Sequence, residues 1–300
     1  MKRSVFVQQN GAECDFNNSD SWVILSPIEQ SIKQKIEAVG TPLKDWDIQI
    51  NYGIKTGFND AFIISTEKRN EILANCQTED ERTRTAELIR PILRGRDIQR
   101  YGYEWAGKYL IATFPSRHYD IEQYPAVKQY LLSFGKERLE QTGKTYFVNG
   151  EKVKARKKTN NKWFETQDSI SYWEDFSKQQ IVWIELSDNP KFALAQNITS
   201  ANTVFFLTGE HILHLLGILN SKLITWYFHH CIGTTSGVGT NRWLKYTIEQ
   251  IPISAPNKEI ENLVNEISKN YNTVLDKKLD YKICLSYHLN DTEISYIIEQ

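Results

Sequence analysis

The sequence has few of the residues that hold metal ions or form disulfide frameworks. Only four of its 300 residues are cysteines, with no Cys-x-x-Cys pair and no group of histidines near them other than the adjacent pair His229-His230. They are Cys14, Cys76, Cys231 and Cys284. Cysteines this far apart argue against a zinc site and against a disulfide-stabilised fold, and they fit a protein of the reducing cytoplasm.

Long hydrophobic runs and an excess of one charge are lacking too. No stretch reaches the roughly 18 consecutive apolar residues that a membrane-spanning helix needs, and residues 1–16 contain no signal-peptide core. The formal net charge is −1, so the chain as a whole has no basic character that would attract nucleic acid. We therefore expect a cytoplasmic protein without a membrane partner, in which any affinity for nucleic acid is local.

Catalytic motifs of the common DNA enzymes are missing. An adenine methyltransferase needs a tetrapeptide of the Asn-Pro-Pro-Tyr type and a glycine-rich loop for its cofactor. The one Asn-Pro pair is followed by Lys191, and no Gly-x-Gly-x-x-Gly follows an expected strand. Common metal-dependent nucleases use Glu-x-Lys, whose carboxylate holds Mg²⁺ and whose lysine organises the attacking water, and this segment does not occur. We predict that the chain has no catalytic residues and binds no cofactor.

Two other segments only imitate such sites. Asp276-Lys277-Lys278 is close to the nuclease pattern, but we expect it to be solvated charge on a surface helix. His229 and His230 are adjacent, and neighbours on a helix point about 100° apart, which makes it difficult for them to share one ion. We therefore expect no metal site. The rival interpretation of the whole chain is a complete endonuclease whose acidic catalytic residues are scattered along the sequence.

The hydrophobic patterns mix strands and helices without a regular alternation, which predicts an α+β fold with a mixed sheet. The spacing of Ile28, Ile32, Ile36 and Val39 predicts a helix that ends at Gly40. Expected strands are two in 46–65 joined by a tight loop, then 108–115, 181–186 and 203–209. Expected helices are the first part of 67–90, then 120–141, 211–231 and 258–279.

The clearest positive signal is a basic segment, residues 152–162, which we call the basic strip. It lies within 143–168, a stretch that indicates a long hairpin or excursion, and none of its residues is acidic. The candidate DNA-contacting residues here are Lys152, Lys154, Arg156, Lys157, Lys158 and Lys162, followed by Trp163. Basic residues flanked by aromatic ones attract a phosphate backbone, because neutralised phosphates release their counterions. The alternative is a solvated loop, which is common for charge runs.

A second candidate is the glycine-rich and threonine-rich loop at residues 233–243. Its glycines let the backbone approach a partner closely, and its small polar groups can form hydrogen bonds. The candidate DNA-contacting residues are Thr234, Thr235, Ser236, Asn241 and Arg242, the last a bidentate donor suited to guanine or phosphate. The alternative is an ordinary connector after a buried helix.

A third candidate is the turn at residues 53–62. Lys55 and Thr56 lie between two glycines and could hold an anion on backbone N–H groups. No helix start follows as in a phosphate-binding loop, so a structural turn is the alternative.

Five segments, in this order, resemble the TaqI-like C-terminal specificity domain. They are GIKTGFNDAFII at 53–64, PILRGRDIQRY at 91–101, IVWIEL at 181–186, LLGILNSKLITWYF at 215–228 and IEQIPIS at 248–254. That domain is the DNA-reading C-terminal part of Type IIG restriction-modification enzymes and related adenine-specific DNA methyltransferases, and it is akin to Type I specificity subunits. The resemblance extends over roughly residues 20–280.

The resemblance implies recognition of a short double-stranded DNA site, with methyltransferase and nuclease domains in the same enzyme or in a partner subunit. It implies an N-terminal segment and docking helix in 1–40, a target-recognition domain in 41–256, and a C-terminal helix and tail in 257–300. The shared motifs are expected to be scaffold, because base-reading residues vary with the site they read. The basic strip would hold phosphates while polar residues near 163–168 and 234–242 reach base edges. A protein-interaction module is the third interpretation.

The missing cofactor loop can be tested directly. We expect the chain to bind no S-adenosylmethionine and to transfer no methyl group, because neither the catalytic tetrapeptide nor the glycine-rich loop is present. Isothermal titration calorimetry of the purified chain with S-adenosylmethionine should give no binding heat. Micromolar affinity would contradict this prediction.

Overall fold

Residues 25–235 and 241–299 are described by the computed structural model, and they divide into two compact units. Unit 1 contains the chain up to Ile48, the segment Leu186–Phe192 and the chain from Gly209 onward. Unit 2 contains Gln49–Glu185 and Ala193–Thr208. Both units are therefore assembled from segments far apart in sequence. The functional boundaries expected at residues 40 and 256 stay a prediction.

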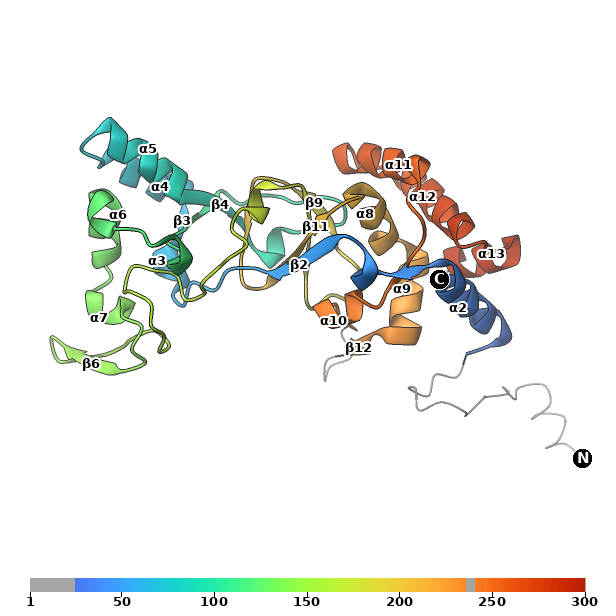
Figure 1. Ribbon diagram of the computed structural model, residues 1–300, viewed down its shortest axis with the longest axis horizontal. Coiled ribbons are helices and arrows are strands. Elements are labelled where there is room, and N and C mark those ends of the chain that lie inside the picture. The colour runs from blue at the N-terminus through green and yellow to red at the C-terminus, as the bar shows by residue number, and fades with distance from the viewer. Residues whose placement is uncertain (1–24, 236–240, 300) are drawn as a thin grey trace, which may run out of the picture. The chain divides into compact units, whose positions relative to one another are not determined.

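Two four-stranded sheets form the frame of unit 2 (Figure 1). The first, in the order β10-β4-β5-β3, consists of Thr199–Ser200, Ile89–Leu93, Lys108–Ile111 and Ile63–Ser65. The second, in the order β2-β11-β8-β9, consists of Ile48–Tyr52, Val204–Gly209, Gln180–Ile184 and Ala193–Ala195, of which only Ile48 and Gly209 fall to unit 1. Strand β10 pairs with β4 in parallel, whereas β5 pairs antiparallel with both β4 and β3. Mixed sheets with helices around them confirm the α+β class.

The helices of unit 2 are shorter and more numerous than the sequence predicts. They include α4 (Thr66–Ala74), α5 (Glu79–Leu88), α6 (Pro125–Leu132) and α7 (Lys136–Leu139). The expectation that only the first part of 67–90 is helical is wrong, because Thr78 caps α5 by accepting a hydrogen bond from the Glu81 N–H. The single helix expected over 120–141 is also wrong. Gly135, at a φ of +83°, separates α6 from α7, and glycine takes this angle without steric cost.

Residues 46–65 form two strands, but the tight loop expected between them is wrong. Strands β2 and β3 lie in different sheets, and a short helix, α3 (Asn59–Phe62), precedes β3. Gly53 passes directly against another backbone segment, since a Cβ there would lie 1.9 Å from the Ala201 carbonyl oxygen. Thr56 is buried and its hydroxyl donates to Asn59 Oδ1 at 2.7 Å. This geometry supports the structural-turn interpretation of Thr56.

Unit 1 is organised around helix α8 (Ile212–Asn220), in which every apolar side chain except that of Leu213 is buried. Gly217 lets α11 (Lys258–Lys269) approach α8, since a Cβ there would lie 2.7 Å from Val264 Cγ2. The one helix expected over 211–231 is wrong, because Ser221 has an extended backbone and caps a new helix, α9 (Lys222–Tyr227). A π-helical turn, Phe228–Ile232, continues α9.

The two ends of the described chain meet within unit 1. Helix α2 (Pro27–Val39) confirms the expected N-terminal helix, and its Lys35 forms an ion pair of 2.6 Å with the buried Glu293. The last helix expected over 258–279 is instead divided: α12 (Thr273–Ser286) begins after the capping residue Asn272, and α13 (Asp291–Glu299) follows. Asp276 is only 7 % exposed, so the expectation of solvated charge is wrong for this residue.

Short elements complete unit 1. Strands β1 (Thr41–Pro42) and β14 (Pro252–Ile253) pair antiparallel, and α10 (Lys245–Ile248) precedes β14. The buried Tyr287 hydroxyl donates to the Pro252 carbonyl oxygen at 2.8 Å and accepts from the Ser254 N–H at 3.0 Å, which fixes β14 to the end of α12. Among the described helices, none is long and apolar enough to span a membrane.

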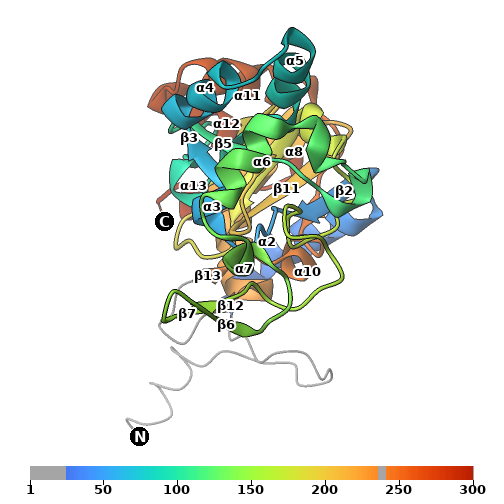
Figure 2. The same ribbon diagram turned by 90° about the vertical axis from the view of Figure 1, so that its left-hand side faces the viewer.

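A β-hairpin lies beside α7 in unit 2 (Figures 1 and 2). Its strands, β6 (Thr145–Val148) and β7 (Glu151–Lys154), pair antiparallel. The turn residues Asn149 and Gly150 both have positive φ angles, +52° and +84°, as a two-residue turn of the common hairpin type requires. A hairpin is therefore present within 143–168, but it is short, whereas the sequence indicated a long hairpin or excursion.

Arg156, two residues beyond the hairpin, is only 2 % exposed although it belongs to the basic strip. Its guanidinium donates hydrogen bonds of 2.7–2.9 Å to the carbonyl oxygens of Leu139, Thr56, Glu165 and Trp163. Burial, and to a lesser extent the nearby Arg138, lowers the pKa of Arg156 to about 10, which leaves it charged at neutral pH. One side chain thus ties the basic strip to α7 and to the turn at 53–62.

We predict that Arg156→Ala lowers the free energy of unfolding by at least about 3 kcal/mol, because several buried carbonyl groups lose a charged donor. Urea denaturation followed by circular dichroism measures this loss. The matched control is Lys157→Ala, which changes an exposed neighbour and should shift stability by no more than about 0.5 kcal/mol. Equal effects of the two substitutions would show that the Arg156 hydrogen bonds do not stabilise the fold.

Candidate nucleic-acid interface

The lysines of the basic strip are all exposed. They are Lys152, Lys154, Lys157, Lys158 and Lys162. In the hairpin, Phe147 lies opposite Lys152 and Thr145 opposite Lys154. Residues two apart on a strand share a face, so these four side chains lie on one side of the hairpin. That side presents two ammonium groups and the ring of Phe147, which is 72 % exposed, while the other side is half-buried.

Two residues of the predicted DNA-contacting set face the protein interior. The prediction that Arg156 contacts DNA needs correction, because its guanidinium is occupied by four carbonyl groups inside unit 2. Trp163 is half-buried, packs against the hydrophobic core of unit 2 and meets Phe164 edge-on, with ring centroids 5.5 Å apart. That Trp163 contacts DNA stays a prediction.

Two residues beside the basic strip were not in the predicted set. Phe147 is one of them, and the Asn149-Gly150 turn in the sequence would have been enough to place it opposite Lys152. The other is Arg138 on α7, whose Cζ lies 4.0 Å from the ring centroid of Phe58 and whose Nη1 donates to the Lys154 carbonyl oxygen at 2.9 Å. No local pattern could reveal Arg138, because only the tertiary fold brings α7 beside β7.

The loop at 233–243, in unit 1, begins and ends with short paired strands. Strand β12 (Thr234–Thr235) is antiparallel to β13 (Asn241–Arg242), with Thr234 opposite Arg242 and Thr235 opposite Asn241. Ser236 lies outside the described residues. The structure therefore brings four of the five predicted residues of this loop together, in a two-stranded ladder.

Strand β13 is held by the buried residue that follows it. Trp243 stacks on Phe228 with ring centroids 3.8 Å apart, and its indole N–H donates to the Ser187 carbonyl oxygen at 2.9 Å. Asn241 and Arg242 are half-buried, and the Asn241 amide lies 3.0 Å from His229 Nε2. Burial, with the neighbouring His230, lowers the pKa of His229, so its ring is neutral at physiological pH and can accept this hydrogen bond.

Residues that could hold a metal ion are not clustered in the described part of the chain. There, no group of three or more His, Cys, Asp or Glu residues has a suitable arrangement. His229 is instead a hydrogen-bonding neighbour of Asn241.

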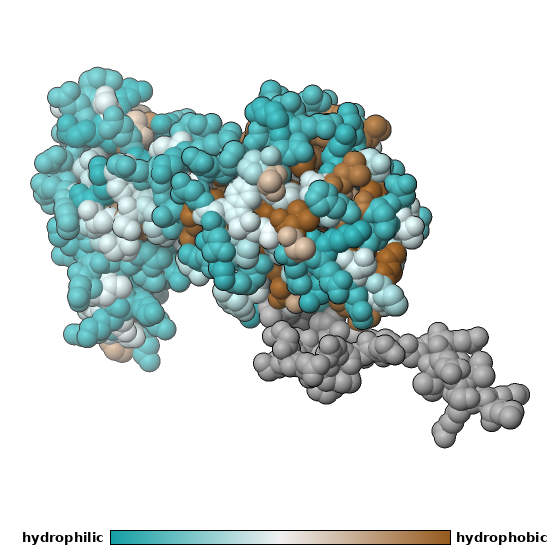
Figure 3. All heavy atoms as spheres, turned by 45° about the vertical axis from the view of Figure 1, so that its right-hand side comes forward, coloured by the Kyte–Doolittle hydropathy of each residue, from teal (hydrophilic) through white to brown (hydrophobic). Residues whose placement is uncertain are grey.

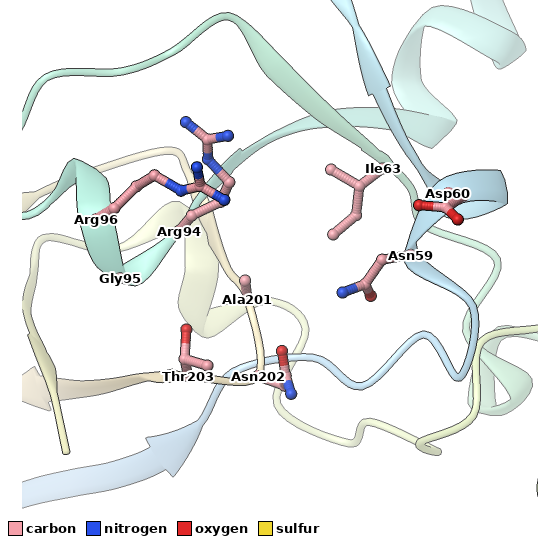
Figure 4. Close-up of a pocket in the computed structure, with 9 residues that line it drawn as sticks. All are labelled: Asn59, Asp60, Ile63, Arg94, Gly95, Arg96, Ala201, Asn202 and Thr203. Carbon is pink, nitrogen blue, oxygen red and sulfur yellow. The ribbon is translucent and has the colours of Figure 1, made fainter. Parts of the chain in front are cut away.

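An open cleft of about 410 Å³ in unit 2 lies between two of the five segments that resemble the specificity domain (Figure 4). Its lining comes from the segment 53–64, the segment 91–101 and the turn between β10 and β11, and comprises Asn59, Asp60, Ile63, Arg94, Gly95, Arg96, Ala201, Asn202 and Thr203. The two arginine side chains lie along one side of the cleft, and Asn59 lies across from them (Figure 4). The sequence indicated these segments as scaffold but did not predict the cleft.

The arginine side of the cleft is rigidly built. Asp97 accepts hydrogen bonds of 2.7–3.1 Å from the backbone N, Nε and Nη2 of Arg94. Burial alone would raise the pKa of Asp97, but these hydrogen bonds and the charge of Arg94 lower it. Asp97 is therefore a carboxylate at neutral pH and neutralises Arg94, whereas Arg96 is exposed.

Known proteins share this fold and sequence pattern. The sequence model of the family described as the TaqI-like C-terminal specificity domain matches residues 90–253. No curated protein sequence gives a match. The structure of the Type IIL restriction-modification enzyme MmeI, determined in complex with DNA, is similar with a TM-score of 0.53 at 15 % identity, over 86 % of this chain and 36 % of its own. The type IIG restriction endonuclease BpuSI is similar with a TM-score of 0.54 at 14 % identity, over 91 % of this chain and 32 % of its own.

This chain thus spans about a third of the length of both enzymes, and at these identities the likeness concerns the fold. The matched residues 90–253 are more than half of the chain. They include the central strands of unit 2, the basic strip and helices α8 and α9. By this match the chain belongs to the family of TaqI-like C-terminal specificity domains.

Proposed function

We propose that the chain recognises a specific double-stranded DNA site as the specificity domain of a restriction-modification enzyme. Its methyltransferase and nuclease domains would lie elsewhere in that enzyme or in a partner subunit. The observation that carries the proposal is the row of exposed lysines on a segment fixed by the buried Arg156. Family membership, and the likeness to MmeI in its DNA complex, support it.

The lysines of the basic strip suit binding to the DNA backbone, which does not depend on the base sequence. Each ammonium group that neutralises a phosphate releases counterions into solution. Because Arg156 fixes the segment that carries them, less conformational entropy is lost when the lysines meet the backbone. The exposed ring of Phe147, on the same side of the hairpin as Lys152, could pack on sugar or wedge at a base step.

Recognition of the DNA bases is proposed for other residues. Arg242 and Asn241 lie on a strand whose position is set by Trp243, and the guanidinium fork matches the O6 and N7 acceptors of guanine. Trp163 directly follows the basic strip and is half-buried. Phosphate contacts position a protein on DNA, whereas contacts to base edges carry the specificity.

Unit 1 is proposed to meet the remainder of the enzyme. Val274, Tyr281 and Leu285 are exposed on α12, at spacings of seven and four residues that place them on one helix face. Hydrophobic patches also gather over unit 1 in Figure 3, whereas the visible surface of unit 2 is mainly hydrophilic. Exposed apolar patches mark surfaces that meet other proteins.

We predict that changing Lys152, Lys154, Lys157 and Lys158 together to Ala weakens binding similarly for every DNA sequence, since these residues contact phosphates. The slope of log affinity against log salt should become shallower by about 0.9 for each phosphate that the variant no longer neutralises. Fluorescence anisotropy with labelled duplexes at several salt concentrations measures this. Arg156 is left unchanged so that the segment keeps its fold.

The control variant removes the same charge from exposed lysines of unit 1, namely Lys44, Lys269, Lys277 and Lys278. It should keep the wild-type slope. If both variants keep it, the basic strip is solvated charge and the proposed grip is wrong. Mg²⁺-dependent cleavage of DNA by the chain alone would favour the endonuclease interpretation instead.

We predict that Arg242→Ala or Trp163→Ala reduces the preference for one base pair of the recognised site. A bidentate arginine–guanine pair is worth roughly 1–3 kcal/mol of discrimination, and the Trp163 ring could wedge at a base step. Binding of each variant to the cognate duplex and to a panel of single-base variants measures this. Weaker binding confined to the cognate site supports base reading. Equal weakening on every duplex indicates a phosphate contact, and a lower melting temperature without a DNA-specific effect indicates a structural residue.

A further inference from the structure

Two arginines of unit 2 share one indole ring. The Cζ atom of Arg117 lies 3.9 Å from the ring centroid of Trp173, and that of Arg90 lies 5.4 Å from it. Trp173 is half-buried and packs against the hydrophobic core of unit 2, so the ring is a fixed platform. A guanidinium over the face of a tryptophan is stabilised by the ring quadrupole and loses freedom of movement.

This arrangement brings two positive charges to one aromatic ring. In the described part of the chain, neither Arg90 nor Arg117 forms an ion pair with a carboxylate. Both guanidinium carbons lie within about 6 Å of one ring centre, so the two are at most about 9 Å apart, which is close to the Debye length of about 8 Å at physiological salt. The two charges therefore repel each other, and a bound anion would relieve the repulsion.

The cleft of Figure 4 lies on the same sheet face as Arg90. In the first sheet, Leu110 on β5 is flanked by Arg90 on β4 and by Ile63 on β3. Directly opposed residues point to the same face, and neighbouring strands are about 4.8 Å apart. Ile63 lines the cleft, so the cleft begins about two strand spacings from Arg90, on the same side of the sheet.

The charges around the cleft add to this positive surface. Asp97 neutralises Arg94, but Arg96 is exposed, and Asp60 is the acidic residue of the cleft lining. Arg96 thus adds an exposed positive charge to a cleft lining that contains one carboxylate, in a chain whose formal net charge is −1. Asn59 and Thr203 add neutral groups that can donate hydrogen bonds to an oxygen atom.

We propose that Arg90, Arg117 and Arg96 form a second phosphate-binding surface for the DNA backbone, separate in sequence from the basic strip. The inference rests on the proposed function, since its ligand is the phosphodiester backbone of the same duplex. The planar fork of arginine donates two parallel hydrogen bonds to a phosphate, and contact with the Trp173 ring restrains two of these forks beforehand. Trp173 is a positioning residue, and Arg94 with Asp97 supports the cleft.

The test uses a labelled 30-base-pair duplex of random sequence and the full chain. In the variant Arg90→Gln, Arg96→Gln, Arg117→Gln, the slope of log affinity against log salt should become shallower by about 2 to 3, at about 0.9 for each phosphate that is no longer neutralised. Lysine at the same three positions keeps the charge and should retain most of the slope. The control variant Lys269→Gln, Lys277→Gln, Lys278→Gln removes three exposed charges from unit 1 and should leave the slope unchanged.

Circular dichroism and the melting temperature show whether the triple variant is destabilised. If it is, the single variant Arg96→Gln replaces it in the binding assay, because Arg96 is exposed on a short turn. It should make the slope shallower by about 0.9. If the wild type binds the duplex and folded arginine variants keep its slope, the second surface is refuted while the proposed function stands. A wild-type chain that binds no duplex at low salt would overturn both.

Discussion

Four backbone carbonyl groups converge on the guanidinium of Arg156, and the candidate DNA-contacting surface of unit 2 depends on this convergence. Removing such an ion from water costs several kcal/mol, and this cost is offset only when nearly all of its donors are used. The hydrogen bonds join the end of α7, the turn at 53–62 and the segment 163–165. The five lysines around Arg156 can therefore remain solvated while the backbone that carries them is fixed.

The elements that were correctly expected are those with a strong local pattern. Helix α2 has a capping serine and regular apolar spacing, and β5, β8 and β11 are compact apolar runs. The helix breaks at Gly135, Ser221 and Asn272 were missed, although each of these residues favours a break or a cap, because the apolar periodicity on both sides is continuous. Local capping geometry ended those helices where the hydrophobic pattern alone did not.

The sequence predicted which residues of the candidate site are charged, but not which of their side chains point to the solvent. Composition marks the basic strip, yet nothing local distinguishes Arg156, which is buried, from Lys157, which is exposed. The difference comes from carbonyl groups contributed by residues up to 100 positions away. The cleft in unit 2 was missed for the same reason, since Asn59, Arg94 and Asn202 become neighbours only through the order of strands in the sheet.

The division of the chain into interleaved segments limits how specificity can be exchanged between relatives. The polypeptide passes from one unit to the other at 48/49, 185/186, 192/193 and 208/209. A chimaera cut once between residues 185 and 193 would separate β11 from its partner β8 and leave β9 and β10 without the strands they pair with. Transplanting unit 2 therefore requires residues 49–185 and 193–208 to be transferred together, which also transfers the seven residues 186–192 that belong to unit 1. A recombination event between two such genes would therefore need two crossovers, near 48/49 and 208/209, and the donor's residues 186–192 would have to pack within the recipient's unit 1.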